Sequence, residues 1–339
     1  MQKHKFLLVI FIFITQLVTA AKIDTVYFQN GNKITGEVKI MENNLLEFST
    51  DDAGKIKIEW SEIDSIYIKQ RIRIEHSDGR VLFGTLRPTR KPKVAILLKD
   101  DMTPLLLKHI NIATIAPDDI NFLTRFDGKI SSGFSYTKAS ELGRFNFAGN
   151  ILYRHNLNQF EINYSVLTER ENENQNEKQN GGIHYIRLLP RKWFFISHLF
   201  AESNSELNLQ LRTNCVLGFG NTLIYTNHSV MYVAGGLNTN RETTSDNSTF
   251  NLEGALSLNF TVYKYSSPEL SFYFKGTVYP SINNFGRFRT NLESTLSWEV
   301  LNDLFFKWTF YHDFDNRPLN SDDPLSDWAI GLLGIEYKF

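Results

Sequence analysis

The chain has little cysteine: a single one, Cys215, stands among 339 residues. One thiol excludes a framework of internal disulfides, a cysteine-rich zinc site and an iron–sulfur cluster. The chain also lacks an excess of charge of either sign, because its 36 Lys and Arg residues are balanced by 37 Asp and Glu residues. Nucleic-acid-binding proteins usually carry a clear basic excess, so we expect no nucleic-acid partner.

Long hydrophobic runs are absent as well. No stretch reaches the roughly 18 apolar residues of a membrane-spanning helix, and the mean hydropathy is −0.27. Aromatic residues are nevertheless abundant, with 27 Phe and 14 Tyr. This much aromatic surface in a chain that is hydrophilic on average must be distributed among polar residues. Any insertion into a membrane would therefore have to use strands.

The first twenty residues have the three parts of a secretory signal peptide. Residues 3–5 (KHK) form a positive start, residues 6–14 an apolar run, and residues 18–20 (VTA) a site of compact residues for signal peptidase. We therefore predict that residues 1–20 are a signal peptide and that the protein is exported.

An internal repeat occupies residues 21–117. Gly31 and Gly36 are matched 48 residues later by Gly79 and Gly84. Ile63 and Ile66 of IDSIYI are matched 49 residues later by Ile112 and Ile115 of INIATIAP. The spacing predicts two small β units, 21–70 and 71–117, each a strongly bent five-stranded barrel of the SH3-like or Sm-like kind by analogy. Trp60 aligns with Lys108 or His109, so no paired aromatic platform is expected. Residues 118–127 form the predicted linker.

From residue 128 onward, apolar and polar residues alternate over long runs. The fourteen residues 250–263 (FNLEGALSLNFTVY) keep this alternation throughout. Strands of soluble proteins have about 5–6 residues, whereas tilted membrane strands need about 9–11 plus overhang. We count twelve such segments, with weaker alternation in the fourth and fifth. They start near residues 128, 143, 159, 181, 193, 207, 228, 249, 269, 286, 303 and 328.

The connections between these segments differ in kind. Some are tight, such as 156–158 and 266–268, and three are long and polar, at 169–180, 238–249 and 315–327. Short periplasmic turns and long external loops are typical of outer-membrane barrels. The predicted fold is all-β, with a C-terminal antiparallel transmembrane β-barrel of about twelve strands (128–339) after a duplicated small β domain. The expected location is the outer membrane of a Gram-negative bacterium, with residues 21–117 in the periplasm.

The last strand carries a separate signal. Every second residue of this strand is predicted to face lipid, and the series ends in a terminal aromatic residue. Outer-membrane assembly machinery recognises such a C-terminal strand. The predicted partners are therefore this machinery and outer-membrane lipid, with a periplasmic protein or a cell-wall component as the partner of residues 21–117. The residues of this predicted C-terminal assembly signal are Gly331, Leu333, Ile335, Tyr337 and Phe339.

Charged residues on the inner parity of the barrel are of both signs, which predicts a mutually paired network rather than a charge-selective channel. Twelve strands enclose either a filled lumen or one just wide enough for a small solute, so a diffusion channel stays an alternative. The predicted lumen-facing charges are Arg154, Glu161, Glu253, Lys275, Arg289, Glu293, Glu299, Lys307 and Asp313.

Catalytic signals are scarce. The chain has no Gly-rich phosphate loop, no His-x-x-x-His pair and no Gly-x-Ser-x-Gly elbow, so we expect no catalytic residue, metal or cofactor. A lipid hydrolase is the third alternative, which would need a histidine about 3 Å from a serine hydroxyl. The candidates are the scattered residues His184, His198, His228 and His312.

Several short motifs in the second part of the chain carry a family resemblance. They are Arg212 with Gly218-Phe219-Gly220, Tyr279-Pro280-Ser281, and the closing pattern Asp315…Pro318…Asp327…Gly331…Tyr337-Lys338-Phe339. With them, residues 128–339 resemble the YdiY-like salt-induced outer-membrane proteins, catalogued as domain of unknown function 481. The resemblance implies an outer-membrane β-barrel of unassigned activity. The leading expectation is a non-enzymatic barrel with a structural or stress-related role in the envelope.

Overall fold

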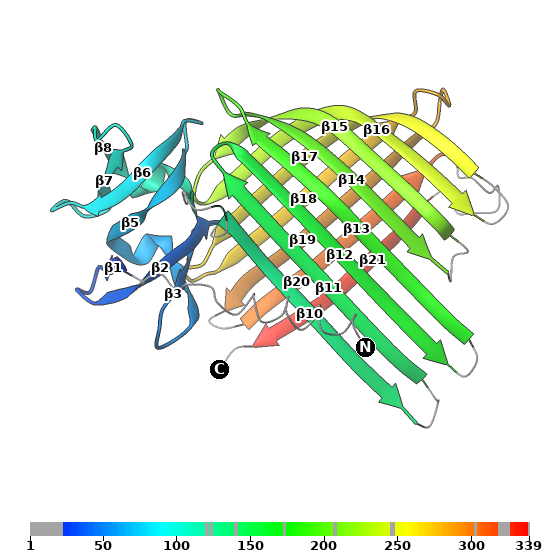
Figure 1. Cartoon of the computed structure of the whole chain (residues 1–339), viewed down its shortest axis with the longest axis horizontal. Helices are drawn as coiled ribbons and strands as arrows, with labels where there is room; N and C mark the ends of the chain where they lie inside the picture. Colours follow the sequence, from blue (N-terminus) through cyan, green and yellow to red (C-terminus); the bar gives the residue numbers. More distant parts are fainter. Residues whose placement is uncertain are drawn as a thin grey trace, which may run out of the picture.

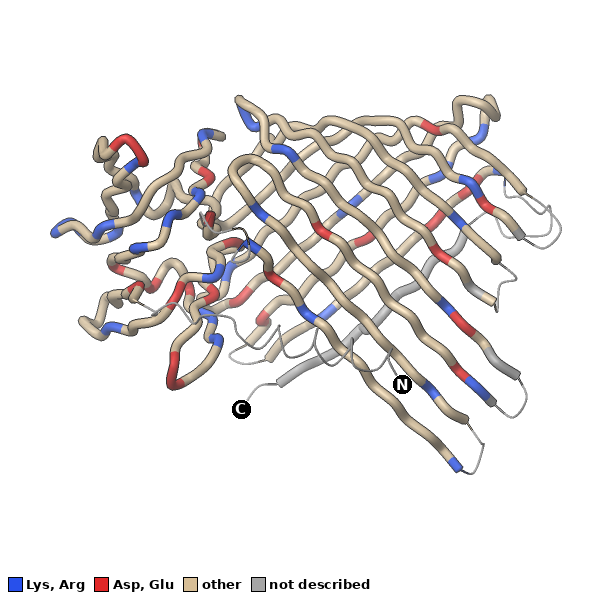
Figure 2. Tube along the Cα trace, in the orientation of Figure 1, with Lys and Arg blue, Asp and Glu red and all other residues tan. Residues whose placement is uncertain are grey.

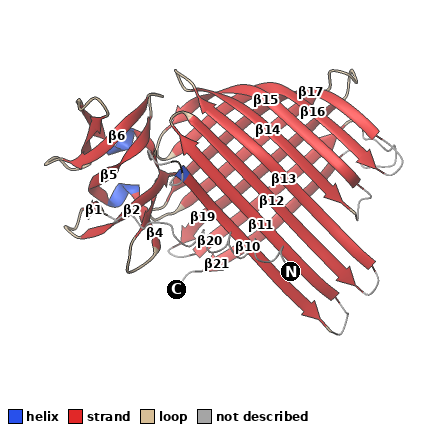
Figure 3. Ribbon diagram, viewed as in Figure 1, coloured by secondary structure: helices blue, strands red, loops and turns tan. Residues whose placement is uncertain are grey.

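The computed structural model describes residues 23–118, 122, 125–138, 142–171, 174–205, 209–244, 248–301, 304–317 and 326–337. Nearly all of the described backbone is strand, with short helical turns on the smaller part (Figure 3). Two antiparallel sheets account for it: one of nine strands followed by one of twelve. Within these ranges, no helix has the length and apolar character that crossing a membrane requires. The predicted signal peptide and Phe339 lie outside the described residues.

The nine-stranded sheet and its two 3₁₀ turns form what we call the N-terminal module, residues 24–117. Its elements are β1 (Asp24–Phe28), β2 (Lys33–Glu42), β3 (Leu45–Ser49), β4 (Lys55–Glu59), η1 (Trp60–Glu62), β5 (Ile63–His76), β6 (Val81–Pro88), β7 (Val94–Lys99), β8 (Pro104–Lys108), η2 (His109–Asn111) and β9 (Ile112–Pro117).

The strand β5 is shared by both halves of the module. β1 pairs with β2 and with the first part of β5, and the second part of β5 pairs with β6 and β9 in the same manner. The boundary expected between residues 70 and 71 therefore falls inside one continuous strand. A single apolar core, which contains Val26 and Ile66 from one half and Ile74 and Ile115 from the other, fills the module.

Two glycines occupy matching places in the halves. A Cβ atom on Gly36 would lie 2.5 Å from the Ser49 carbonyl oxygen, and one on Gly84 would lie 2.1 Å from that of Leu98. Backbone hydrogen bonds match as well, since Phe28 N donates to Asn32 O and His76 N donates to Arg80 O, both at 2.9 Å. Glycine is required at both positions because the neighbouring strand approaches too closely for a side chain.

The two 3₁₀ turns meet in the core. The ring of Trp60 in η1 lies 4.7 Å from that of His109 in η2, and Trp60 Nε1 donates a hydrogen bond to the His109 carbonyl oxygen at 3.0 Å. The two positions that align in the repeat are therefore in direct contact. Both rings are buried, however, so they stabilise the joint between the halves and offer no surface platform.

A buried carboxylate, Asp24, ties β1 to β2 and to the first part of β5. It accepts hydrogen bonds from the backbone N–H groups of Val38 at 3.0 Å and of Lys69 at 2.9 Å. These bonds favour the charged form, but desolvation by burial is the larger effect and raises the pKa of Asp24.

The large sheet follows with twelve strands joined in sequence order. They are β10 (Phe126–Thr137), β11 (Leu142–His155), β12 (Asn158–Glu171), β13 (Asn174–Leu188), β14 (Trp193–Asn204), β15 (Leu209–Tyr225), β16 (Ser229–Thr244), β17 (Ser248–Lys264), β18 (Leu270–Pro280), β19 (Phe288–Leu301), β20 (Leu304–Asp315) and β21 (Ser326–Tyr337). Figure 1 shows this sheet curving back on itself, with the N-terminal module at one end.

The curved sheet is consistent with the predicted barrel, and its strand count agrees with the prediction. It is not closed, because no hydrogen-bonded ladder joins β21 to β10 within the described ranges. The side chains of β10 are accordingly exposed along nearly its whole length. Four of the residues of the predicted assembly signal, Gly331 to Tyr337, lie in β21.

The prediction of long loops at 169–180 and 238–249 was wrong, because most of these residues belong to strands. β12 continues to Glu171 and β13 begins at Asn174, while β16 continues to Thr244 and β17 begins at Ser248. Strand pairing uses backbone groups, so polar segments continue the ladder without any apolar side chains. Figure 2 shows charged residues gathered near these strand ends and on the module.

Acidification should destabilise the module through His109. The ring is 3% exposed, and desolvation lowers its pKa from 6.5 to about 4. In the unfolded chain this histidine takes up a proton near pH 6.5, whereas in the folded chain it does so only near pH 4. Stability should therefore fall by about 3 kcal/mol between about pH 7 and pH 4 because of this one group.

The measurement is the urea midpoint followed by Trp60 emission, in full-length protein whose other four tryptophans are replaced by phenylalanine. The difference between the parent and His109→Gln isolates the histidine from the opposing effect of Asp24. His228→Gln, in a turn of the large sheet, is the control that should keep the parental slope. Equal pH slopes for the parent and His109→Gln would contradict the assignment.

Candidate functional site

The module contacts the turns at one end of the large sheet. Tyr225, the last residue of β15, donates a hydrogen bond from Oη to Glu75 Oε2 at 2.6 Å. Thr114 Oγ1 lies 3.0 Å from the same hydroxyl, and Arg73 forms a 3.0 Å salt bridge with Glu75. All of these side chains are largely shielded from solvent. The joint is therefore a connected polar network, which the low dielectric of its surroundings strengthens.

A second set of bonds fixes the start of the predicted linker. Asp118 Oδ1 accepts a hydrogen bond from the backbone N–H of Asn156 at 2.8 Å and lies 3.0 Å from Nδ1 of His155. Arg71 forms a salt bridge with the same carboxylate. From the module, Arg73 Nη1 donates to the Asn156 carbonyl oxygen at 3.1 Å. The turn between β11 and β12 is thus held from both sides.

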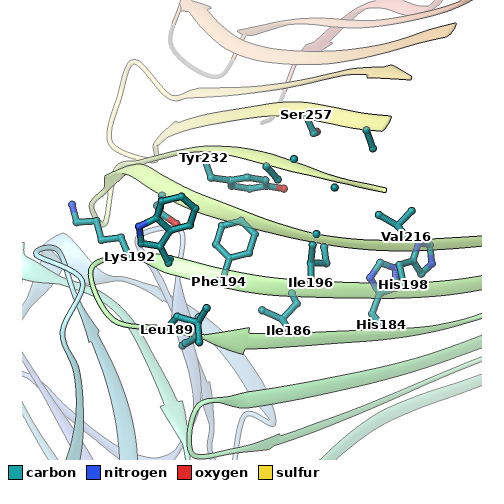
Figure 4. Close-up of a pocket in the computed structure, with 18 of the residues that line it drawn as sticks. His184, Ile186, Leu189, Lys192, Phe194, Ile196, His198, Val216, Tyr232 and Ser257 are labelled. Carbon is teal, nitrogen blue, oxygen red and sulfur yellow. The ribbon is translucent and has the colours of Figure 1, made fainter. Parts of the chain in front are cut away.

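A cavity of about 380 Å³ lies inside the curve of the large sheet, next to the module. Its walls come from β13 to β18, and Glu75, Gly79 and Val81 of the module contribute at one end. Figure 4 shows Phe194 and Ile196 between Lys192 at one end and the two rings of His184 and His198 at the other. The apolar residues of the wall are Ile186, Leu188, Leu189, Trp193, Phe194, Ile196, Val216, Ala234 and Ala255.

The polar end of the cavity contains three basic side chains, those of His184, His198 and Lys275. The rings of His184 and His198 stack with their centroids 3.7 Å apart and their planes at 21°. Lys275, which lines the cavity from β18, interacts electrostatically with both rings. Neither Lys275 nor Lys192 forms a salt bridge within the described part of the chain. Lys275 faces Glu293 in strand register, yet no ion pair forms between them there.

Glycines on β15 and β16 give the cavity its room. Gly218 and Gly236 face each other in register and place no side chain on the wall. A Cβ atom on the nearby Gly220 would lie 2.2 Å from the ring of Phe194, so this ring packs against the bare backbone. A larger residue at Gly220 would displace the ring of Phe194.

Strand register places the nine predicted lumen charges on the face of the sheet that carries Lys275. Two of them form an ion pair: Arg289 binds both carboxylate oxygens of Glu253, at 2.9 and 2.7 Å. Amides and backbone groups serve several others. Asn150 donates to Glu161 at 2.6 Å, Asn291 donates to Asp313 at 2.5 Å, the Glu269 backbone N–H donates to Glu299 at 2.7 Å, and Arg154 lies 3.5 Å from Asp127.

The apolar wall was missed by the sequence reading, which assigned polar residues to the whole inner face. Its signal was the weak alternation in the fourth and fifth segments. Ile183 and Leu199 are exposed on the outer face, while their chain neighbours His184, Ile186, Ile196 and His198 line the cavity. Apolar residues on both faces of a strand remove the period of two. In the described residues, no group of three His, Cys, Asp or Glu side chains could hold a metal ion.

Breaking the buried pair of Glu253 should be costly. Glu253 is 1% exposed and also accepts a hydrogen bond from Asn238 at 2.8 Å. Glu253→Gln leaves the Arg289 guanidinium without its carboxylate, so the free energy of unfolding should fall by about 2–3 kcal/mol. Glu169→Gln is the matched control, since its partner Arg144 is 55% exposed and the pair should contribute less than about 1 kcal/mol. Equal shifts in the urea midpoint of the two variants would refute this.

Removing one hydroxyl should loosen the module. Tyr225→Phe eliminates the bond to Glu75 at the joint, which should make separation of the module about tenfold more frequent. Thr222, which lines the cavity, can report this as Thr222→Cys in a Cys215→Ser background. The measured quantity is the rate of labelling by a maleimide polymer. Tyr185→Phe is the control, because Tyr185 bonds Asn158 within the large sheet. The idea fails if both tyrosine variants label at the parental rate.

Comparison with known proteins leaves the activity open. No curated protein and no solved structure matches this chain. One family model matches residues 130–331, which covers β11 to β20 completely, most of β10 and half of β21. The matched part is more than half of the chain, and it contains the residues of the large sheet that line the cavity. The chain therefore belongs to the family described as protein of unknown function, DUF481.

Proposed function

We propose that this protein is a non-enzymatic outer-membrane β-barrel, formed by residues 128–339, with a structural or stress-related role in the bacterial envelope. The N-terminal module would lie in the periplasm and cover the periplasmic end of the barrel. The observation that carries this proposal is the distribution of side chains across the large sheet, which is the reverse of that in a water-soluble protein.

The outer face of the sheet exposes large apolar side chains. Leu256 is 62% exposed, and its neighbours in the sheet behave alike. Monomeric soluble proteins rarely expose apolar patches larger than a few hundred Å². Lipid is the environment in which such a surface is stable. Members of this surface are Phe145, Ile151, Phe160, Ile162, Ile183, Leu199, Leu217, Phe219, Val233, Leu237, Leu256, Val278 and Trp298.

The inner face buries polar groups instead. Asn238, Glu253 and Thr277 are buried, and each has its own partner: Asn238 donates to Glu253, while Thr277 Oγ1 lies 3.0 Å from Ser257 Oγ. Polar groups removed from water are stable only when they are hydrogen-bonded. A polar interior with an apolar exterior is the arrangement that membrane strands require.

The orientation follows from the turns. Tight turns after β11, β13 and β15 lie against the module, and barrels in the outer membrane have their short turns in the periplasm. The matching strand pairings, glycines and backbone hydrogen bonds of the two halves support a duplicated origin of the module. The exposed surface of such a module suits a spacer or a contact with a periplasmic protein or the cell wall.

An open diffusion channel is the weaker candidate. The module lies across the turn end, and its residues contribute to the wall of the cavity there. Buried bonds such as Glu253–Arg289 occupy the inner face farther along. The hydrolase alternative needs a histidine beside a serine hydroxyl, whereas His184 and His198 stack on each other. These features favour a filled barrel without catalysis.

Electrophoresis and bilayer recordings test the proposal. The unheated protein in mild detergent should migrate faster than the boiled protein, as folded barrels do, and should fractionate with outer membranes. Purified protein added to a planar bilayer should give no single-channel steps, because the module covers one end. A mature chain that is soluble without detergent would refute the barrel, and regular conductance steps would favour the channel.

A further inference from the structure

The cavity differs chemically from the rest of the inner face. Elsewhere this face carries residues such as Asn150, Asn291 and Glu293, but β13 to β15 present Ile186, Ile196 and Val216. A barrel that needed only a filled interior would continue its polar pairing here. Apolar side chains that border an open space are instead the usual lining of a ligand pocket.

The ionisable groups of the cavity leave positive charge without a partner. The one carboxylate on the wall, Glu75, is already neutralised by Arg73 and bonded by Tyr225. Lys275 and Lys192 form no salt bridge among the described residues. Lys275 lines the same cavity as His184 and His198, whose rings can donate N–H bonds to an anionic group there. Glu161, in register with His184, also acts on that ring but does not line the cavity. The site therefore fits a ligand that is negative at one end.

The shape agrees with an elongated ligand. Small-molecule pockets have volumes of roughly 300–1,000 Å³, and this one measures about 380 Å³. Along β14, Phe194 and Ile196 follow one another from the module toward His198, and Ile186 accompanies them on β13 (Figure 4). A hydrocarbon chain could extend along this strip as far as Val81 of the module, while its charged end stays near Lys275.

We propose that the cavity binds a single-chain anionic amphiphile, with its carboxylate or phosphate head at Lys275 and its hydrocarbon chain along Ile186, Ile196 and Phe194. The charge of Lys275 selects the head, and the length of the apolar strip limits the chain. The module closes the far end, so the chain does not pass through.

The test uses the full mature protein in lipid nanodiscs, with a fluorescent polyene fatty acid as the probe. Saturable binding at one probe per protein is expected. Dodecanoate and dodecyl phosphate should displace the probe, and the better competitor identifies the head group. Dodecanol should compete at least tenfold less well. Among carboxylates, affinity should rise about fourfold per methylene until the strip is filled.

Two substitutions with matched controls locate the site. Ala255→Phe fills the cavity and should abolish saturable binding, whereas Leu256→Phe on the outer face should leave it unchanged. Lys275→Met should weaken dodecanoate binding by about tenfold or more. Its control is Lys307→Met, a lysine on the same sheet face that does not line the cavity. Heat-modifiable migration of each variant shows that it is folded, and Ala234→Leu replaces Ala255→Phe if the latter does not fold.

Three results would overturn the proposal: no saturable binding, equal competition by dodecanol and dodecanoate, or an unchanged affinity in the folded cavity-filling variant. An equal effect of the two lysine substitutions would likewise exclude the head-group site at Lys275. None of these results bears on the membrane location, because migration and fractionation test the barrel without any ligand. The two proposals can therefore fail separately.

Discussion

The period of two in the large sheet is the constraint on which the rest of the structure depends. Register ties every side chain to one face, so Leu256 and Ser257, adjacent in the chain, face opposite environments. A slip of one residue in β17 would turn Glu253 outward and leave Arg289 buried without its carboxylate. Buried pairs of this kind therefore penalise wrong registers, while the apolar outer face tolerates many different side chains of similar character.

The chain combines two ways of satisfying the same physical demands. In the module, Val26 and Ile74 fill an apolar core, and the buried carboxylate Asp24 is bonded by backbone amides. In the large sheet the apolar groups lie outside and the polar groups are bonded inside. Among the described residues the two parts meet at turns of the large sheet, and several of the contacts there are polar, as between Tyr225 and Glu75.

The strands were the most predictable part of the fold, because their faces differ in polarity. Eleven of the twelve predicted starts lie within two residues of the observed ones, and only β13 begins well before residue 181, at Asn174. The errors have one cause: polar residues such as 174–180 extend the ladder through backbone bonds, which leave no mark on side-chain polarity. The continuity of β5 across residue 70 could not be predicted either. A repeat in the sequence suggests two separate units and does not reveal that its two copies share a strand. Pairing of Trp60 with His109 depends on that sharing.

Departures from alternation are, for the same reason, the most informative part of such a sequence. A membrane strand with a polar inner face shows clear alternation, and each apolar residue on that face has a cost, since it gives up a hydrogen bond in the interior network. His184, Ile186, Ile196 and His198 lie together on one wall of the cavity that Lys275 also lines, and are not scattered along the sheet. Because the residues that break the alternation all border one cavity, we infer that they form a single site. The weak pattern of β13 and β14 is thus the trace that the cavity leaves in the sequence.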